Sequence, residues 1–273
     1  MFDVELVGKI GSMALINKEY NDIDYNIFAR LSGELKPGYV WVTSGATEIG
    51  RIDYIKRNGK ELSGTDEEIK TDYSAQGQSI LMSLYRTYIN QLYSVRQILV
   101  EHQHFNDEVK LEYLKRTLLR CPKEKAIPII NYNDAVSYEE NVKMEISALK
   151  KKKEKAVHCL DNDETASQIA CLLKPRILLI LTSVDGIYED YSDKGSLITD
   201  INGKDVYEVI ENISHYQKSC YGASRKGANG AGAKLEYIKE PVKLGTKVII
   251  ASSKYPIKKI LEKTVPCTTI EVK

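Results

Sequence analysis

The chain has 273 residues, 42% of them hydrophobic, which is enough to bury a sizeable core. Its 39 basic and 38 acidic residues leave a formal net charge of +1, so no global field favours nucleic acid or a membrane, and any anion site has to be local. Five widely spaced cysteines, no apolar run of the ~18 residues that a membrane span needs, and no signal-peptide pattern together predict a cytoplasmic protein with reduced thiols.

Short apolar runs alternate along the chain with longer stretches of helical spacing. The runs predicted as buried strands are residues 4–7, 39–42, 95–100, 126–130, 177–181 and 247–251. Two sets of apolar residues show helical spacing between them, namely Ile80, Leu81, Leu84, Tyr88 and Leu92, and then Ala166, Ile169, Ala170 and Leu173. This alternation predicts an α/β fold in which helices cover both faces of a mainly parallel sheet.

Ligands of such sheets bind beyond the carboxyl ends of the strands, so the loops at those ends are where chemistry is expected. Four loops follow apolar strands and carry small or polar residues: 9–12, 43–45, 131–136 and 182–186. A fifth loop of small residues, 227–233, precedes a helix and follows no obvious strand.

In the stretch TSGATEIGR, residues 43–51, the chain follows an apolar strand with three small residues, Ser44, Gly45 and Ala46. Three interpretations are open at this point. Ser44 is a nucleophile, or the turn is a hole for an anionic substrate, or it is a tight turn without chemistry, in which Ser44 caps the following helix.

Two segments combine glycine with lysine. In GANGAGAKLEY, residues 227–237, glycines allow backbone N–H groups to approach a phosphate, and Lys234 adds a charge at the start of a helix. In VGKIGS, residues 7–12, Lys9 ends the first strand and can reach a phosphate at the sheet edge. The alternatives are a flexible glycine loop and a surface lysine.

Two segments place asparagine beside aspartate. Asn131, Asn133 and Asp134 follow a predicted strand, and Asp161, Asn162 and Asp163 form the second group. Asp161 also fits the cap of a helix N-terminus.

The histidines and the lysine-rich segment 137–160 are predicted to be surface features. The segment contains four consecutive lysines and is expected to form a charged hairpin or lid that is partly helical. The four histidines, which sit in charged or exposed-looking segments, are His102, His104, His158 and His215.

Taken in order, seven motifs resemble the amino acid kinase family, and within it the glutamate 5-kinases. They are KIGS, VTSGATEIGR, SAQGQSILMSLY, IPIINYNDAV, DNDETAS, ILLILTSVDGIY and GANGAGAKLE. The resemblance implies a three-layer αβα sandwich. It implies a single domain over 1–273, with an acceptor-binding part at about 1–165, an ATP-binding part at about 166–273 and no additional C-terminal domain.

The resemblance also implies roles for matching residues. The catalytic residues are Lys9 and Lys234, which flank the transferred phosphoryl group, and Asp163, which orients them. The acceptor contacts are Ser44, Gly45, Ala46, Asp134 and Asn162. The nucleotide contacts are Lys9, Gly11, Ser12, Thr182, Ser183, Asp185, Gly227, Gly230 and Lys234. ATP and Mg²⁺ are expected, with the metal held by phosphates and water and not by a dedicated set of protein ligands.

The implied reaction is ATP-dependent phosphorylation of the side-chain carboxylate of glutamate, the first step of proline synthesis. A carboxylate is already ionised at neutral pH and needs no general base, which agrees with a site of lysines and glycines without histidine. Ser183 stands where the family usually has aspartate, and 137–160 is longer than the corresponding loop. The alternatives are therefore another small acceptor (an amino acid, carboxylate, phosphonate or nucleoside monophosphate) and a nucleotide-binding protein without turnover. We also expect a homo-oligomer.

Overall fold

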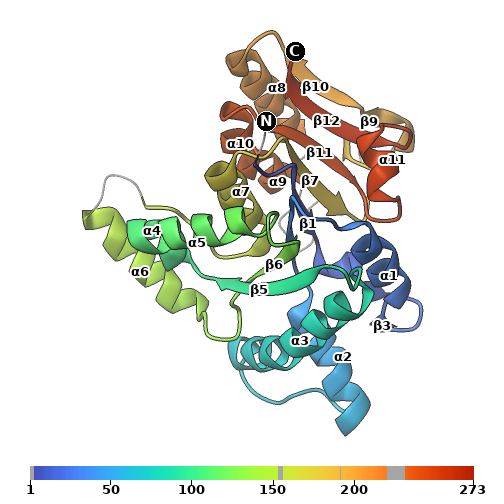
Figure 1. The fold of residues 1–273 in the computed structure, drawn as a ribbon, viewed down its shortest axis with the longest axis vertical. Coiled ribbons are helices and arrows are strands. Elements are labelled where there is room, and N and C mark those ends of the chain that lie inside the picture. The colour runs from blue at the N-terminus through green and yellow to red at the C-terminus, as the bar shows by residue number, and fades with distance from the viewer. Residues whose placement is uncertain (1–2, 153–155, 191, 220–230) are drawn as a thin grey trace.

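A single eight-stranded sheet forms the centre of the molecule (Figure 1). The computed structural model describes residues 3–152, 156–190, 192–219 and 231–273. The strand order is β10-β12-β11-β7-β1-β4-β6-β5, and every neighbouring pair is parallel except β11 and β12. The strands are β1 (Leu6–Ile10), β4 (Tyr39–Thr43), β5 (Ser94–Val100), β6 (Ala126–Tyr132), β7 (Ile177–Thr182), β10 (Asp200–Gly203), β11 (Lys247–Ser252) and β12 (Cys267–Val272).

The six predicted strands are confirmed as members of this sheet, with one shift in position. The first strand was expected at 4–7, but β1 spans Leu6–Ile10 and continues through Lys9. Four further short strands form two hairpins outside the sheet, which the sequence did not reveal: β2 (Ile16–Asn17) with β3 (Asp22–Ile23), and β8 (Ile187–Tyr188) with β9 (Leu197–Ile198).

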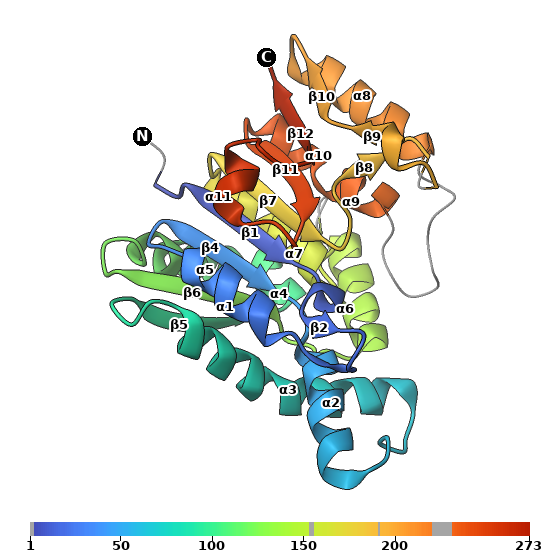
Figure 2. The ribbon, with the colours of Figure 1, turned by 90° about the vertical axis from the view of Figure 1, so that its right-hand side faces the viewer.

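Helices cover both faces of the sheet, which confirms the predicted three-layer αβα architecture (Figure 2). Helices α1 (Tyr25–Glu34), α2 (Ala46–Asn58), α3 (Asp66–Tyr88) and α11 (Ile257–Leu261) contribute to one core. The opposite core receives α4 (His102–Asn106), α5 (Glu108–Arg120), α7 (Asn162–Leu173), α8 (Val206–Ser219), α9 (Ala231–Tyr237) and α10 (Lys239–Lys243). None of the helices in the described ranges is both long enough and apolar enough to span a membrane.

The pleat of β1 decides which layer Lys9 meets. Leu6 and Val7 pack into opposite cores, as successive side chains of a strand must. Lys9 is two residues after Val7 and therefore points to the same layer, which contains α7. The fold thus directs a lysine toward the N-terminal end of that helix.

Helices α2 and α3 cross closely enough to require glycine at both contact points. A Cβ atom at Gly50 would lie 1.8 Å from the Tyr73 carbonyl oxygen, and one at Gly77 would lie 1.8 Å from the Ala46 carbonyl oxygen. Because Ala46 is the first residue of α2, this crossing fixes the helix end that follows the Ser44–Gly45 turn.

Two local predictions need correction. Helix α3 ends at Tyr88, so Leu92 is not part of its apolar face, and its side chain is 79% exposed. The lysine-rich segment is partly helical, as expected, but it is not a hairpin, because residues Glu139–Lys152 form helix α6. Val142 and Ile146 of this helix are buried, so α6 packs on the body of the protein through an apolar face.

We expect Gly77→Ala to destabilise the protein by at least about 1–3 kcal/mol, because the added methyl group forces α2 and α3 apart. Gly33→Ala is the matched control. Gly33 lies on α1, and a methyl group added there would have nothing within 4 Å, so alanine should be neutral or stabilising by about 0.5–1 kcal/mol. Urea unfolding measures both, and equal stabilities of the two variants would contradict the close crossing.

Candidate active site

Three charged residues from distant parts of the chain meet at the carboxyl end of β1. Lys9 of β1 is only 5% exposed, and its Nζ lies 2.7 Å from Oδ1 of Asp163, at the start of α7. Nζ of Lys234, on α9, lies 3.7 Å from the other carboxylate oxygen, Oδ2. We call these three residues the transfer cluster. The structure thus brings together the three residues predicted as catalytic.

The electrostatic balance of the cluster keeps Asp163 ionised. Burial alone would raise the pKa of this carboxyl group, but the ammonium groups of Lys9 and Lys234 outweigh burial and hold the pKa below its usual range. One carboxylate thus holds two lysines in place, and the cluster carries one net positive charge.

Helix α7 begins at a position that places Asp163 in its first turn. Asp161 is the N-cap, and its Oδ1 accepts hydrogen bonds of 2.8 Å from the backbone N–H groups of Asp163 and Glu164. The prediction that Asp161 caps a helix is therefore confirmed. Burial raises the pKa of Asp161, and the backbone hydrogen bond from Glu164 opposes this shift.

The turn after β4 requires a glycine. Gly45 has φ of +102° and is the N-cap of α2 without a side-chain cap bond, so the interpretation of Ser44 as the helix cap is wrong. Ser44 lies at the carboxyl end of β4, and its backbone N–H donates to the carbonyl of Ile10 at 3.1 Å. The turn is thus tied to the loop that begins after β1.

A chain of amide side chains connects the β6 end to α7 and α3. Asn162 Oδ1 accepts from the Tyr132 N–H at 2.8 Å, and its Nδ2 donates to Asn131 Oδ1 at 2.8 Å. Asn131 in turn donates to Gln78 Oε1 at 2.6 Å. Asn162 therefore fastens the start of α7 to β6, in addition to any contact with an acceptor.

Asp134 follows β6 and is ion-paired with a residue that the sequence did not single out. Nζ of Lys70, on α3, lies 3.0 Å from Oδ1 of Asp134. The Lys70 side chain is 49% exposed and that of Asp134 is 17% exposed, so the pair is open to solvent on the lysine side.

The loop after β7 holds the residues predicted to bind the nucleotide. Oγ1 of Thr182 donates to the carbonyl of Val184 at 2.7 Å and accepts from its N–H at 3.1 Å, which shapes the turn around Ser183. Asp185 is ion-paired with Lys254 at 2.7 Å. Gly227 and Gly230 lie outside the described residues.

A cleft of about 700 Å³ unites most of these groups. Its lining includes predicted residues from both parts of the chain: Lys9, Gly11, Ser12, Ser44, Asn162, Asp163, Thr182, Ser183 and Lys234. The lining does not include the predicted contacts Gly45, Ala46, Asp134 and Asp185. Gly45 directly follows Ser44 in the chain, and Asp134 is ion-paired with Lys70, so these two adjoin lining residues.

The cleft also includes Lys70, His158, Glu164 and Tyr237, which sequence reasoning missed. Nδ1 of His158 lies 3.0 Å from Oε1 of the buried Glu164, so this histidine lies at the cleft. Burial raises the pKa of Tyr237, and the nearby acids raise it further. Glu164 and Tyr237 belong to the motifs DNDETAS and GANGAGAKLEY, but their own roles were not predicted, and Lys70 lies on helix α3 at a position outside every motif singled out from the sequence.

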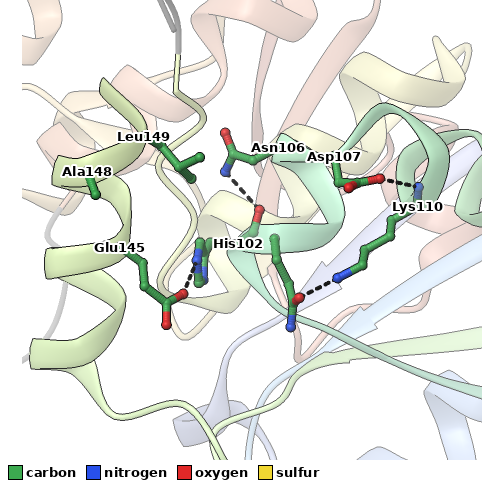
Figure 3. Close-up of a pocket in the computed structure, with 8 residues that line it drawn as sticks. His102, Asn106, Asp107, Lys110, Glu145, Ala148 and Leu149 are labelled. Atoms are coloured by element: carbon green, nitrogen blue, oxygen red, sulfur yellow. Dashed lines mark hydrogen bonds and ion pairs between the residues drawn. The ribbon is translucent and has the colours of Figure 1, made fainter. Parts of the chain in front are cut away.

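A second cavity, of about 420 Å³, lies between α4 and α6 and shares no lining residue with the cleft (Figure 3). His102 is buried there, and its Nε2 lies 2.8 Å from Oε2 of Glu145 on α6. The prediction of a surface position is therefore wrong for His102, because α6 packs across it. His104 is half-buried, with its ring bonded to the N–H of Glu101 at 3.0 Å, whereas His215 is exposed as predicted.

The cluster and the cleft lie within a segment that matches a known family. Residues 6–252 match the model described as the amino acid kinase family. The chain belongs to the amino acid kinase family. The resemblance inferred from the seven motifs is thereby confirmed.

A curated relative agrees with this assignment, and two solved structures share the fold. Glutamate 5-kinase of Streptococcus suis (strain 05ZYH33) is 29% identical over 261 residues, which are 93% of this chain and 66% of that protein. The chain thus spans slightly less than two thirds of that relative's length. Carbamate kinase from Giardia lamblia bound to AMP-PNP gives a TM-score of 0.60 at 15% identity, covering 100% of this chain and 99% of that one. UMP kinase from Ureaplasma parvum gives 0.54 at 14% identity, with 100% and 99% covered. These structures show the shared fold.

The donor groups of the cleft suit the phosphate chain of a nucleotide. Two lysines and the small residues Gly11 and Ser12 lie at one end of β1, where a phosphate chain needs cations and close backbone approach. Among the described residues, no three histidine, cysteine or acidic side chains gather as a metal cage. Mg²⁺ that is bound mainly by phosphates and water fits such a cleft, because it needs only one or two protein carboxylates.

We expect Asp163→Asn to lower stability at pH 7 by up to about 3–5 kcal/mol, because it leaves the buried Lys9 without its anion. The folded-state pKa of Asp163 is depressed, so its stabilisation is present above the unfolded pKa of ~3.9 and is lost as the pH falls through the folded value. Urea unfolding of wild type and variant should therefore converge below pH 4. Asp72→Asn, at an exposed position of α3, is the control, and a gap for Asp163→Asn that is independent of pH would contradict this account.

Proposed function

We propose that the protein is an ATP-dependent kinase that phosphorylates the side-chain carboxylate of glutamate. The observation that carries this proposal is the transfer cluster, in which Lys9 and Lys234 are held by Asp163 at the edge of the cleft. Phosphoryl transfer needs little covalent chemistry from the protein and depends on positioning and on stabilised charge. A pre-arranged pair of ammonium groups provides both.

The reaction balances without a general base. A carboxylate oxygen of the acceptor attacks the γ-phosphorus of ATP, the bond to the β,γ-bridging oxygen breaks, and ADP leaves with the electron pair. Negative charge grows on the transferred group and on the leaving oxygen. Lys9 and Lys234 stabilise that charge at fixed positions. Mg²⁺ on the phosphates supplies further positive charge when it is bound.

The choice of glutamate is supported by the motif order and by the name of the Streptococcus relative. In this proposal residues 1–165 bind the acceptor through Ser44, Asp134 and Asn162, and residues 166–273 bind ATP. A different small acceptor is the second candidate, because the structurally similar proteins are a carbamate kinase and a UMP kinase.

The test is ADP release measured with a panel of acceptors that contains glutamate, aspartate, carbamate and UMP. We expect turnover with glutamate, and Lys9→Ala and Lys234→Ala should each lower kcat about 10²–10³-fold while the fold is retained. Lys258→Ala, at a side chain that is 80% exposed, is the control and should be fully active. Activity with another acceptor only would reject glutamate. Folded lysine variants with nearly full kcat would reject the transfer cluster.

Ser44 provides a separate test of how the acceptor is held. If its hydroxyl donates to the acceptor carboxylate, Ser44→Ala should raise KM for glutamate about ten- to a hundred-fold, because one hydrogen bond to a charged group is lost. The intact mass of the wild-type protein should stay unchanged during turnover. A phosphoryl or acyl adduct on Ser44, together with complete inactivity of the variant, would show instead that Ser44 is a nucleophile.

A further inference from the structure

Helix α9, which carries Lys234, is attached to α7 at more than one point. The ion pair of Lys234 with Asp163 is the longer of the two in the transfer cluster, at 3.7 Å against 2.7 Å for Lys9. Lys9 is held within the central strand β1, whereas α9 is a helix of only seven residues. The position of the Lys234 ammonium group therefore depends on how α9 is attached to α7.

Tyr237 attaches α9 to α7 through both its backbone and its side chain. Its backbone carbonyl accepts a hydrogen bond of 2.5 Å from Oγ of Ser167, which is buried on α7. Its side-chain hydroxyl interacts with Glu164, the residue after Asp163 in the first turn of α7. Lys234 and Tyr237 are three residues apart and therefore lie on the same face of α9. Both contacts thus act on the turn that carries Lys234.

Glu164 is a buried carboxylate that the proposed reaction does not use. It is 7% exposed, and burying a carboxylate is unfavourable unless donors satisfy it. The backbone N–H of Leu160 donates to its Oε2 at 2.5 Å, and Nδ1 of His158 lies 3.0 Å from its Oε1. Tyr237 interacts with the same side chain from α9, and Glu164, His158 and Tyr237 all line the cleft. Glu164 therefore joins residues 158–160 to α9 at the cleft.

We propose that Tyr237 is a positioning residue that places Lys234 for phosphoryl transfer, and that Glu164 and Ser167 fix Tyr237 for this purpose. The inference rests on the proposed function, because it concerns the charge that Lys234 supplies to the transferred group. Two apolar residues would attach the helices without the cost of burying a carboxylate, so packing alone does not explain Glu164. Polar contacts at both the carbonyl and the hydroxyl of Tyr237 instead limit the movement of α9. A displacement of about 1 Å near a catalytic group can lower the rate about 10²-fold, so such a constraint matters.

The test is a set of double-mutant cycles on ADP release with the acceptor that the wild-type protein phosphorylates. Tyr237→Phe removes only the hydroxyl group, and Ser167→Ala removes only the donor to the Tyr237 carbonyl. Each change is made alone and combined with Lys234→Ala, and both kcat and KM for ATP are measured. The controls are Tyr207→Phe, at an 85% exposed tyrosine of α8, and Ser214→Ala, whose hydroxyl donates to a backbone carbonyl within α8.

We expect Tyr237→Phe to lower kcat about ten- to a hundred-fold and to leave KM for ATP within about three-fold of wild type, because a misplaced ammonium group loses mainly transition-state contact. Ser167→Ala should act in the same direction. Neither change should lower kcat further in the Lys234→Ala background, since the group that they position is absent there. The two control variants should match wild type.

Two results would overturn the inference while leaving the proposed function in place. One is a wild-type kcat in folded Tyr237→Phe. The other is an equal loss of kcat with and without Lys234, as expected if Tyr237 only stabilises the fold. Should Tyr237→Phe not fold, Ser167→Ala decides by the same two comparisons. If the wild-type protein releases ADP with no acceptor in the panel, the proposed function itself fails, and this inference fails with it.

Discussion

The candidate site depends on one buried carboxylate that lies between two ammonium groups. Lys9 is within a central strand of the sheet, where an unpaired charge would be strongly unfavourable. Asp163 makes that position tolerable, and the cap provided by Asp161 fixes where Asp163 lies in the first turn of α7. Lys234 completes the arrangement from α9. These ion pairs thus join strand β1 to helices α7 and α9, which are distant from it in sequence. All three residues line the cleft.

The central strands could be predicted from sequence because strands buried on both faces are continuous apolar runs. The exception is the first strand, β1, whose position was predicted incorrectly. The first strand was predicted at 4–7 with Lys9 at its end, whereas β1 spans Leu6–Ile10 and includes Lys9, whose charge Asp163 neutralises within the protein. Strands β10 and β12 were missed for a related reason. Their sequences, DING and CTTIEV, contain polar residues, and the position at one end of the sheet does not require an apolar run.

The site could be predicted only as far as its residues lie in glycine-rich or acidic motifs at strand ends or helix starts. Lys9, Asp163 and Lys234 belong to such motifs, and they meet as expected. Lys70 belongs to a long helix whose local sequence resembles any solvated helix, and only the tertiary fold places it beside Asp134. His102 is a second example of a position that the local sequence did not predict, since it was expected at the surface and is buried. Its neighbours Glu101 and Gln103 suggest a surface, but α6 packs over the ring, and a glutamate from that helix pairs with it.

The near-zero net charge of the chain does not exclude a binding site for anions. The cations of the cleft, Lys9 and Lys234, form a local group, and Asp163 neutralises part of their charge. Two lysines without a carboxylate would attract phosphate strongly in every state of the proposed reaction, and equal attraction for the ground state and the transition state does not accelerate transfer. Asp163 offsets one of the two charges and holds both ammonium groups at fixed positions. In the proposed reaction, the remaining positive charge acts most strongly where negative charge grows during phosphoryl transfer. Lys9 and Lys234 thus share one carboxylate in the cleft, so a local cationic site is compatible with a chain whose formal net charge is +1.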